Sequence, residues 1–215
     1  PIKNCSQSKK AFNPIHHKNQ KFMENSQHQK HSLEILFYST SKILERGAYY
    51  GFRALLVVYM MGETLKMEAS EAIAVYGILT ASLVISQIIG AALGDLLVGN
   101  KKSVLIGGGL QALGAFILCI PSTVGLYAGL FFIILGNGFF TPNILANFGK
   151  SYLTKVNLLD AGFTILYLAI NIGAFLGVFL ISFIGEKLGY RFGFAMAGVF
   201  MLLSIVPIIF TKEIN

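Results

Sequence analysis

Four charged residues and two tyrosines lie within twelve positions of an apolar segment that runs from about Leu33 to Met61. These six residues are Lys42, Glu45, Arg46, Tyr49, Tyr50 and Arg53. On a helix with 3.6 residues per turn they fall within about 140° of arc. The opposite face carries Leu44, Gly47, Ala48, Gly51 and Leu55. A carboxylate beside a guanidinium can exchange a proton when its partners change, and a guanidinium binds a carboxylate through two parallel hydrogen bonds.

This segment is long enough to cross a bilayer, which takes about 20 residues. Charged groups at membrane depth cost at least about 2.5–3.5 kcal/mol each, so they normally face a protein interior or a water-filled cavity. An alternative is a helix end whose basic side chains extend to the interface. The adjacent Glu45 and Arg46, the two tyrosines and the further Arg53 disfavour that alternative. We interpret the segment as the lining of a solute pathway.

Composition places the whole chain in the class of polytopic membrane proteins. Hydrophobic residues make up 54% and charged residues 13%, and the mean hydropathy is +0.66. The net charge is +7, but the basic residues lie in the N-terminal tail and in short connections. That distribution indicates topology and no nucleic-acid partner. Cys5 and Cys119 form no framework that predicts a disulfide or a metal site.

Residues 1–32 are polar and have no apolar periodicity, which predicts a disordered basic tail. No apolar core follows its basic residues, so it is not a secretory signal. Its four histidines lack the Cys or carboxylate spacing of a metal site, and we expect them to be solvated. The chain begins at Pro1, and Met23 precedes the first span, so part of the tail is interpreted as an upstream extension or an incomplete start.

Six apolar spans follow the tail and predict an all-α membrane protein with a six-helix transmembrane bundle over residues 33–215. The spans are about Leu33–Met61, Glu71–Val98, Ser103–Pro121, Thr123–Gly149, Asp160–Ile184 and Phe192–Phe210. Glycines within them predict close helix packing. They include Gly90, Gly94, Gly107, Gly108, Gly109, Gly173 and Gly177. Pro142, one turn after Gly136 and Gly138, gives the fourth helix either a bending point or a static kink.

The distribution of Lys and Arg predicts the orientation. One side of the bundle holds eleven of them in the tail and connections, and the other side holds three. Because basic loops stay on the cytoplasmic side, both termini are expected in the cytoplasm of a multi-pass protein of the plasma (inner) membrane.

The polar segment of the first span resembles the signature of the proton-dependent oligopeptide transporter (POT) family, a branch of the major facilitator superfamily. That signature reads Glu-x-x-Glu-Arg-Phe-x-Tyr-Tyr-Gly-x-Arg. Here the stretch is Lys42-x-x-Glu45-Arg46-Gly47-x-Tyr49-Tyr50-Gly51-x-Arg53. Three further stretches resemble family motifs in the same order. They are Gly90-x-x-x-x-Asp95-x-x-x-Gly99-x-Lys101-Lys102, Gly136-Asn137-Gly138-x-x-Thr141-Pro142-Asn143, and Asp160-Ala161-Gly162-Phe163-Thr164-Ile165-x-Tyr167 followed by Asn171-Ile172-Gly173-Ala174.

The resemblance implies a fold of two six-helix bundles with the substrate held between them, of which this chain matches the N-terminal one. That bundle consists of two inverted three-helix repeats. The C-terminal half is absent, so we interpret the chain as a domain of a longer protein or as a truncated reading frame. Transport by six helices alone is not expected.

The same resemblance implies roles for individual residues. Proton coupling and gating are assigned to Glu45 and Arg46, with Lys42 at the position of the first signature Glu. Peptide binding is assigned to Tyr49, Tyr50, Arg53, Asn171 and Thr141, with Arg53 facing the peptide carboxylate and Asn171 the peptide backbone. The cytoplasmic-loop motif comprises Gly90, Asp95, Gly99, Lys101 and Lys102. A proton gradient is the implied energy source, and no cofactor or metal is implied.

Two departures from the family pattern bear on proton coupling. The first Glu of the signature is Lys42 here, and the usual Lys of the fourth helix is Thr141. The chain thereby loses both members of a pair that meets in the family's cavity. Lys42 and Glu45 are spaced i,i+3, so the new ammonium is predicted to pair locally. A third change, Gly47 for Phe, is expected to alter packing more than chemistry.

The leading functional hypothesis is the N-terminal bundle of a proton-coupled di- or tripeptide symporter that works by alternating access. Its partners would be small peptides, the lipid bilayer and the second six-helix half. The alternatives are a carrier of nitrate or another small organic anion, a facilitator without proton coupling, and a transport-inactive half. An enzyme is disfavoured because the spans hold no nucleophile–base pair or metal-ligand cluster.

Overall fold

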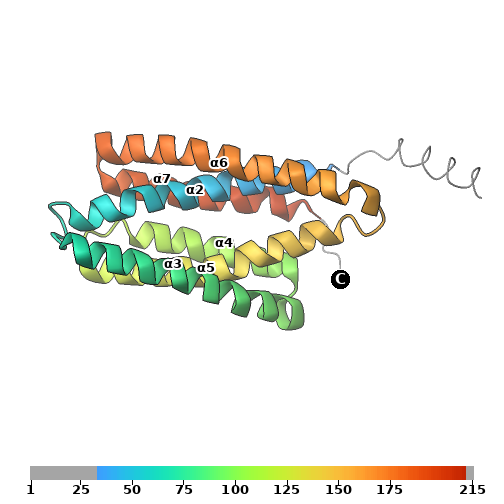
Figure 1. Ribbon diagram of the computed structural model, residues 1–215, viewed down its shortest axis with the longest axis horizontal. Helices are drawn as coiled ribbons and strands as arrows, with labels where there is room; N and C mark the ends of the chain where they lie inside the picture. Colours follow the sequence, from blue (N-terminus) through green and yellow to red (C-terminus); the bar gives the residue numbers. More distant parts are fainter. Residues whose placement is uncertain (1–32, 212–215) are drawn as a thin grey trace, which may run out of the picture. The chain divides into compact units, whose positions relative to one another are not determined.

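The computed structural model describes residues 33–211, so the predicted tail lies outside the described residues. This part of the chain is helical, with six long helices and no strand (Figure 1). The helices are α2 (Glu34–Met61), α3 (Ala69–Leu93), α4 (Asn100–Ile117), α5 (Thr123–Lys150), α6 (Leu159–Leu188) and α7 (Tyr190–Ile209). A short π-helix, η1 (Gly94–Val98), continues α3, and a 3-10 turn, η2 (Val156–Leu158), precedes α6. Each predicted span therefore coincides with a helix.

Four helices are long and apolar enough to cross a membrane, judged by length and composition. They occupy Ala69–Val98, Thr123–Lys150, Val156–Leu188 and Tyr190–Ile209. The remaining long helices, α2 and α4, are not among them. α2 has 28 residues, but it carries five charged side chains, four of them between Lys42 and Arg53. α4 has 18 residues, and Asn100, Lys101, Lys102 and Gln111 lower its hydropathy.

The helices form two groups of three that contact one another mainly through α4 and α7. α2 packs against α6 and α7, while α5 packs against α3 and α4 (Figure 1). The strongest of these contacts keep their pattern when α2 is exchanged with α5, α3 with α6 and α4 with α7, although α6 packs against α7 and α3 itself has no comparable contact with α4. α2 and α5 are therefore the equivalent central helices of the two groups.

Glycine allows the closest of these helix contacts. A Cβ atom on Gly177 of α6 would lie 2.0 Å from the carbonyl oxygen of Gly47 on α2, and one on Gly90 of α3 would lie 2.1 Å from that of Gly138 on α5. The predicted close packing is thus confirmed at these contacts. It also holds at Gly94, Gly107, Gly108 and Gly173. Gly109 differs, because its α-carbon faces open space on α4.

The connection between α3 and α4 is shorter than the sequence predicted. Gly99 alone separates η1 from α4, and its φ of 89° is readily adopted only by glycine. Lys101 and Lys102, which were expected in a loop before a helix starting at Ser103, lie in the first turn of α4 instead. The glycine reverses the chain so sharply that no longer loop is needed.

Two basic side chains link α4 and α7 at opposite ends. The ammonium of Lys101 donates to the carbonyl of Ile209 at 2.9 Å, where α7 ends. The Nε of Arg191 donates to the carbonyl of Cys119 at 3.0 Å, just beyond the end of α4. Cations at helix C-termini satisfy unpaired carbonyls and interact favourably with the helix dipole. These contacts hold the junction of the two helix groups.

Pro142 lies inside α5 without ending the helix. Since proline has no N–H, it cannot donate the usual helical bond to the carbonyl of Gly138. The side chain of Asn143 lies beside this turn, and its Nδ2 donates to Phe139 O at 2.8 Å and to Gly90 O of α3 at 3.0 Å. The proline-containing turn is therefore joined directly to α3.

Candidate functional site

Lys42 and Glu45 form a buried ion pair on α2. Their side chains are 1% and 0% exposed, and Lys42 Nζ lies 3.2 Å from Glu45 Oε2. The local i,i+3 pair predicted from the sequence is thus confirmed. Lys42 Nζ also lies 5.4 Å from the centroid of the Phe140 ring of α5. The ammonium is therefore enclosed between a carboxylate and an aromatic face.

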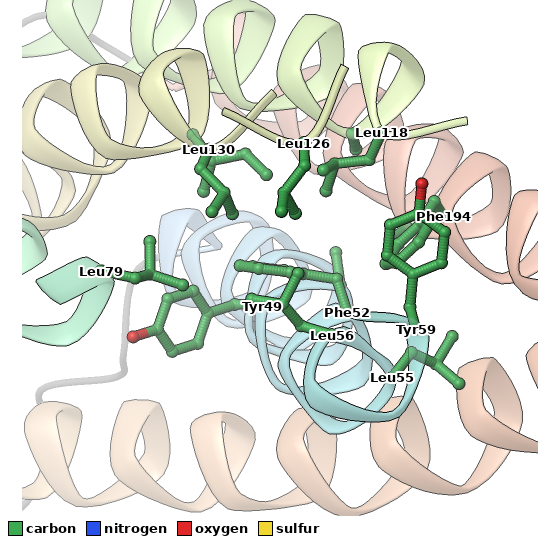
Figure 2. Packing of buried hydrophobic residues seen from close by; sticks show 14 of the residues in the cluster. Tyr49, Phe52, Leu55, Leu56, Tyr59, Leu79, Leu118, Leu126, Leu130 and Phe194 are labelled. Atoms are coloured by element: carbon green, nitrogen blue, oxygen red, sulfur yellow. The ribbon is translucent and has the colours of Figure 1, made fainter. Parts of the chain in front are cut away.

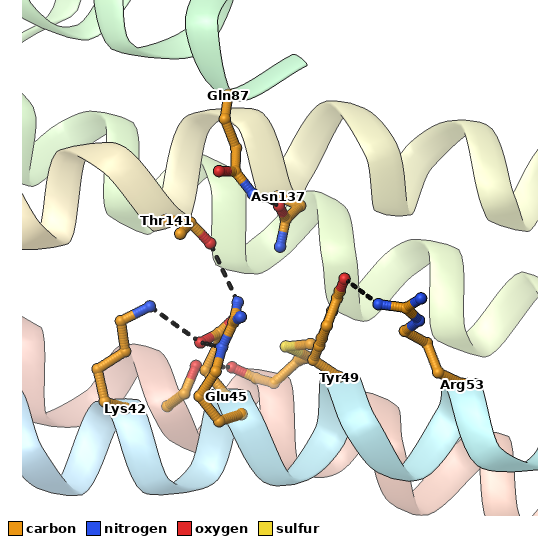
Figure 3. A network of polar contacts seen from close by, with 10 residues as sticks. Lys42, Glu45, Tyr49, Arg53, Gln87, Asn137 and Thr141 are labelled. Carbon is orange, nitrogen blue, oxygen red and sulfur yellow. Dashed lines mark hydrogen bonds and ion pairs between the residues drawn. The ribbon is translucent and has the colours of Figure 1, made fainter. Parts of the chain in front are cut away.

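Arg46 binds the same carboxylate through two hydrogen bonds. Its Nε donates to Glu45 Oε2 at 2.7 Å, and its Nη2 donates to Glu45 Oε1. Nη2 also donates to Thr141 Oγ1 on α5 at 3.1 Å (Figure 3). Two cations therefore share one buried carboxylate. The hydrogen bond to Thr141 connects this cluster to the second central helix.

Tyr49 lies between two guanidinium groups, one turn along α2. Arg53 Nη1 donates to its hydroxyl at 2.7 Å, and Arg46 Cζ lies 4.5 Å from its ring centroid. Arg53 Nη2 donates to Thr80 Oγ1 of α3 at 3.0 Å, and its Cζ lies 4.8 Å from the ring centroid of Tyr76. Contacts with α3 thus hold the Arg53 guanidinium beside Tyr49.

An apolar cluster fixes the position of this polar face. Phe52, which lies between Tyr49 and Arg53 on α2, is almost fully buried and meets the Tyr49 ring edge-on at 5.8 Å between centroids. Figure 2 shows side chains from other helices surrounding this part of α2. They include Leu79 of α3, Leu126 and Leu130 of α5 and Phe194 of α7. Close packing against several helices prevents α2 from rotating, so its polar side chains keep their register.

Two of the predicted binding residues stand apart from the cluster. Tyr50 is 38% exposed, and its ring meets the Tyr49 ring edge-on at 5.1 Å between centroids. Asn171 is exposed on α6, and its amide donates to Tyr167 O of the same helix at 2.8 Å. The other predicted residues of α2, together with Thr141, are brought together.

Asp95 of the predicted loop motif belongs to a separate polar network, which makes no hydrogen bond to the Glu45 cluster within residues 33–211. Asn100 Nδ2 donates to Asp95 Oδ1 at 2.8 Å and to Asn143 Oδ1 at 2.9 Å. Lys150 Nζ donates to Asn100 Oδ1 at 2.7 Å. Gly90 contributes its carbonyl oxygen, which accepts from Asn143 Nδ2 at 3.0 Å, whereas Lys101 bonds to the end of α7 instead. The network ties the end of α3 to α4 and α5.

Sequence reasoning gave no role to Gln87 and Asn137, although Asn137 belongs to a motif that it quoted. Gln87 Nε2 of α3 donates to Asn137 Oδ1 of α5 at 2.8 Å, and Asn137 is 0% exposed. Thr80 and Tyr76 were also missed. A signal was present, since polar residues inside apolar spans are rare and normally face the bundle interior or a cavity.

Comparison with known proteins adds to this geometry. A family model described as the POT family matches residues 101–214. A di-/tripeptide transporter of Lactococcus lactis is 33% identical over 168 residues, which are 75% of this chain and 34% of that protein. An uncharacterised transporter of Bacillus subtilis, YclF, is 34% identical over 80% of this chain and 36% of its own length. The chain therefore spans about a third of the length of these relatives.

Solved structures agree with this relationship. The crystal structure of a peptide transporter POT in complex with sulfate matches with a TM-score of 0.79 and 35% identity, over 83% of this chain and 37% of that one. A POT family transporter in complex with 5-aminolevulinic acid matches with a TM-score of 0.77 and 29% identity, over 81% and 37%. Because the family model covers more than half of the residues and the folds agree, the chain belongs to the POT family.

Proposed function

We propose that this bundle is the N-terminal half of a proton-coupled di- or tripeptide importer. All six long helices would cross the plasma membrane, and their packing symmetry supports two inverted three-helix repeats. The names of the relatives support a peptide as cargo. The proton gradient would supply the energy.

The observation that carries this proposal is the arrangement of guanidinium groups around Tyr49. Arg46 and Arg53 lie on both sides of its ring, and one buried carboxylate serves both Arg46 and Lys42. A short peptide brings its own carboxylate, which a guanidinium can bind through two hydrogen bonds. The tyrosine offers an apolar surface with a polar tip to the peptide backbone. Glu45 is the group that would accept and release the proton.

A second helical half would complete the site. Tyr50, Arg53 and Asn171 all present polar atoms that are exposed or partly exposed. In a membrane such groups face protein or water, not lipid. The relatives are about three times as long as the matched segment, which is the length that a further set of helices requires. This second half would form the opposite wall of the cavity.

The proposed orientation puts both chain termini in the cytoplasm. Single cysteines placed at residues 101 and 187 should differ in their reaction with a membrane-impermeant maleimide added to whole cells. Position 187 lies at the end of α6 and should react, whereas position 101 at the start of α4 should not. The opposite labelling pattern would reverse the orientation.

Removal of Arg53 tests the proposed function itself. In the transporter that contains this bundle, Arg53→Ala is expected to weaken dipeptide uptake by about tenfold or more, because a charge-assisted hydrogen bond contributes roughly 1.5–3 kcal/mol. Uptake of radiolabelled dipeptide at several concentrations gives the change in KM. Lys187→Ala removes a cation from the distant end of α6 and should leave uptake unchanged.

Amidated peptides provide the complementary measurement. A dipeptide with a C-terminal amide should compete poorly with the free acid in the wild type. If it competes equally well, Arg53 does not bind the carboxylate. If wild-type protein transports no di- or tripeptide, the proposed function is wrong.

A further inference from the structure

Asn137 carries a polar group whose placement the ion pairs of α2 do not explain. Its side chain is fully buried in the middle of α5, yet its Nδ2 has no hydrogen-bond partner among residues 33–211. A buried amide that lacks a partner carries a desolvation penalty, so such groups are rare in folded proteins. A group of this kind beside a binding site calls for an acceptor.

Gln87 determines which way the Asn137 amide points. Because Gln87 Nε2 donates to Asn137 Oδ1 at 2.8 Å, the oxygen of Asn137 is directed to α3 and its amino group is directed away from α3. Figure 3 shows the amino group of Asn137 pointing from α5 toward α2, between Glu45 and Tyr49. Thr141, one turn further along α5, contacts Arg46, so this face of α5 adjoins the site. The free donor is therefore pre-oriented.

We propose that Asn137 donates a hydrogen bond to the peptide-bond carbonyl oxygen of the bound cargo, and that Gln87 is its positioning residue. This inference rests on the proposed function. Glu45, Tyr49 and Arg53 follow one another at four-residue spacing, which is about 6 Å per step along α2. A carboxylate held by Arg53 puts the preceding carbonyl one extended residue away, about 3.5 Å back toward Tyr49. The Asn137 amide points to this region.

A sulfur substitution in the cargo tests this hydrogen bond directly. Alanyl-alanine and its thioamide analogue differ only in the peptide-bond acceptor, and sulfur is a much weaker acceptor than oxygen. Inhibition of labelled dipeptide uptake by each compound gives an oxygen-to-sulfur affinity ratio for each variant. The wild type should favour oxygen by about tenfold, the effect of one hydrogen bond of typical net strength.

Asn137→Leu should lower the affinity for the oxygen compound by about tenfold, leave that for the sulfur compound unchanged and bring the ratio close to one. Asn137→Asp, which keeps the shape and removes the donor, should also abolish the preference. Gln87→Leu should reduce the ratio partially, because the amide is then free to rotate. The matched control Asn157→Leu, on an exposed turn before α6, should keep the wild-type ratio.

The ratio separates the possible failures. Loss of folded protein lowers uptake of both peptides equally, so it cannot change the ratio. If the ratio is the same in the wild type, Asn137→Leu and Asn137→Asp, Asn137 does not contact the carbonyl, and the inference is wrong while the proposed function stands. If wild-type protein takes up no dipeptide, the proposed function fails and the inference fails with it.

Discussion

Glu45→Gln is expected to be the most destabilising single substitution in the site. The carboxylate lies between Lys42 and Arg46, and its own side chain is fully buried. Its removal leaves the buried ammonium of Lys42 and the largely buried guanidinium of Arg46, which is 12% exposed, without a counter-charge. Breaking a buried ion pair from one side costs about 3–5 kcal/mol, which is a large part of the roughly 5–15 kcal/mol that stabilises a typical protein. Thermal unfolding of the purified chain in detergent micelles measures the loss.

A compensating double variant and a control at an exposed carboxylate test whether the lost stability comes from the unpaired cations. Lys42→Met combined with Glu45→Gln removes a cation together with the carboxylate, so the double variant should recover part of the lost stability. Glu63→Gln changes an exposed carboxylate in the connection after α2 and should unfold like the wild type. Equal melting of Glu45→Gln and the wild type would mean that the two cations do not depend on Glu45.

The helices and the local ion pair of the site could be predicted because both depend on neighbours in the sequence. Long apolar stretches predicted all six helices, and the i,i+3 spacing predicted that Lys42 contacts Glu45. The sequence also predicted close packing at glycines such as Gly177, because small residues at helical spacing allow backbones to approach.

Contacts between side chains of different helices could not be predicted from neighbouring residues in the sequence. The hydrogen bond from Arg46 to Thr141 joins residues 95 positions apart, and nothing in their spacing indicates it. The bonds of Arg53 to Thr80 and of Gln87 to Asn137 also depend on which faces of α2, α3 and α5 meet. Crossing positions of helices are determined by packing of whole surfaces, which a single sequence does not encode locally.

The resemblance to the family supplied the site residues and a few of their expected neighbours, but not the contacts that they make in this bundle. It placed Asn171 in the binding site, whereas its amide bonds within α6 in this bundle. It also put Lys101 in a loop, although one glycine, Gly99, is enough to connect α3 to α4. A side chain that would contact the second six-helix half has no such partner within this bundle, so its contacts here differ from those that the family pattern implies.

In the transporter proposed above, proton coupling is expected to be limited at Glu45. Protonating this carboxylate requires that its ion pairs with Lys42 and Arg46 both be given up. The Lys that the family has at position 141 is Thr here, and its hydroxyl already accepts a hydrogen bond from Arg46. The other acidic residue of α2, Glu34, lies about two turns before Lys42, which is too far along the helix to replace Glu45 as the counter-charge. We therefore expect dipeptide accumulation to depend only weakly on an imposed pH gradient.

Restoring the family's residues at positions 42 and 141 together should strengthen proton coupling. Lys42→Glu with Thr141→Lys puts a carboxylate on α2 and an ammonium on α5, close to the side chains that now meet at Arg46. Lys42→Glu alone adds a buried negative charge, and Thr141→Lys alone adds a cation beside Arg46, so neither single change should improve coupling. One proton per peptide at a gradient of one pH unit corresponds to about 1.36 kcal/mol, or roughly tenfold accumulation. In proteoliposomes, the double variant should approach this limit while the wild type stays well below it. Strong gradient dependence in the wild type that Lys42→Ala abolishes would instead make Lys42 part of a working coupling site.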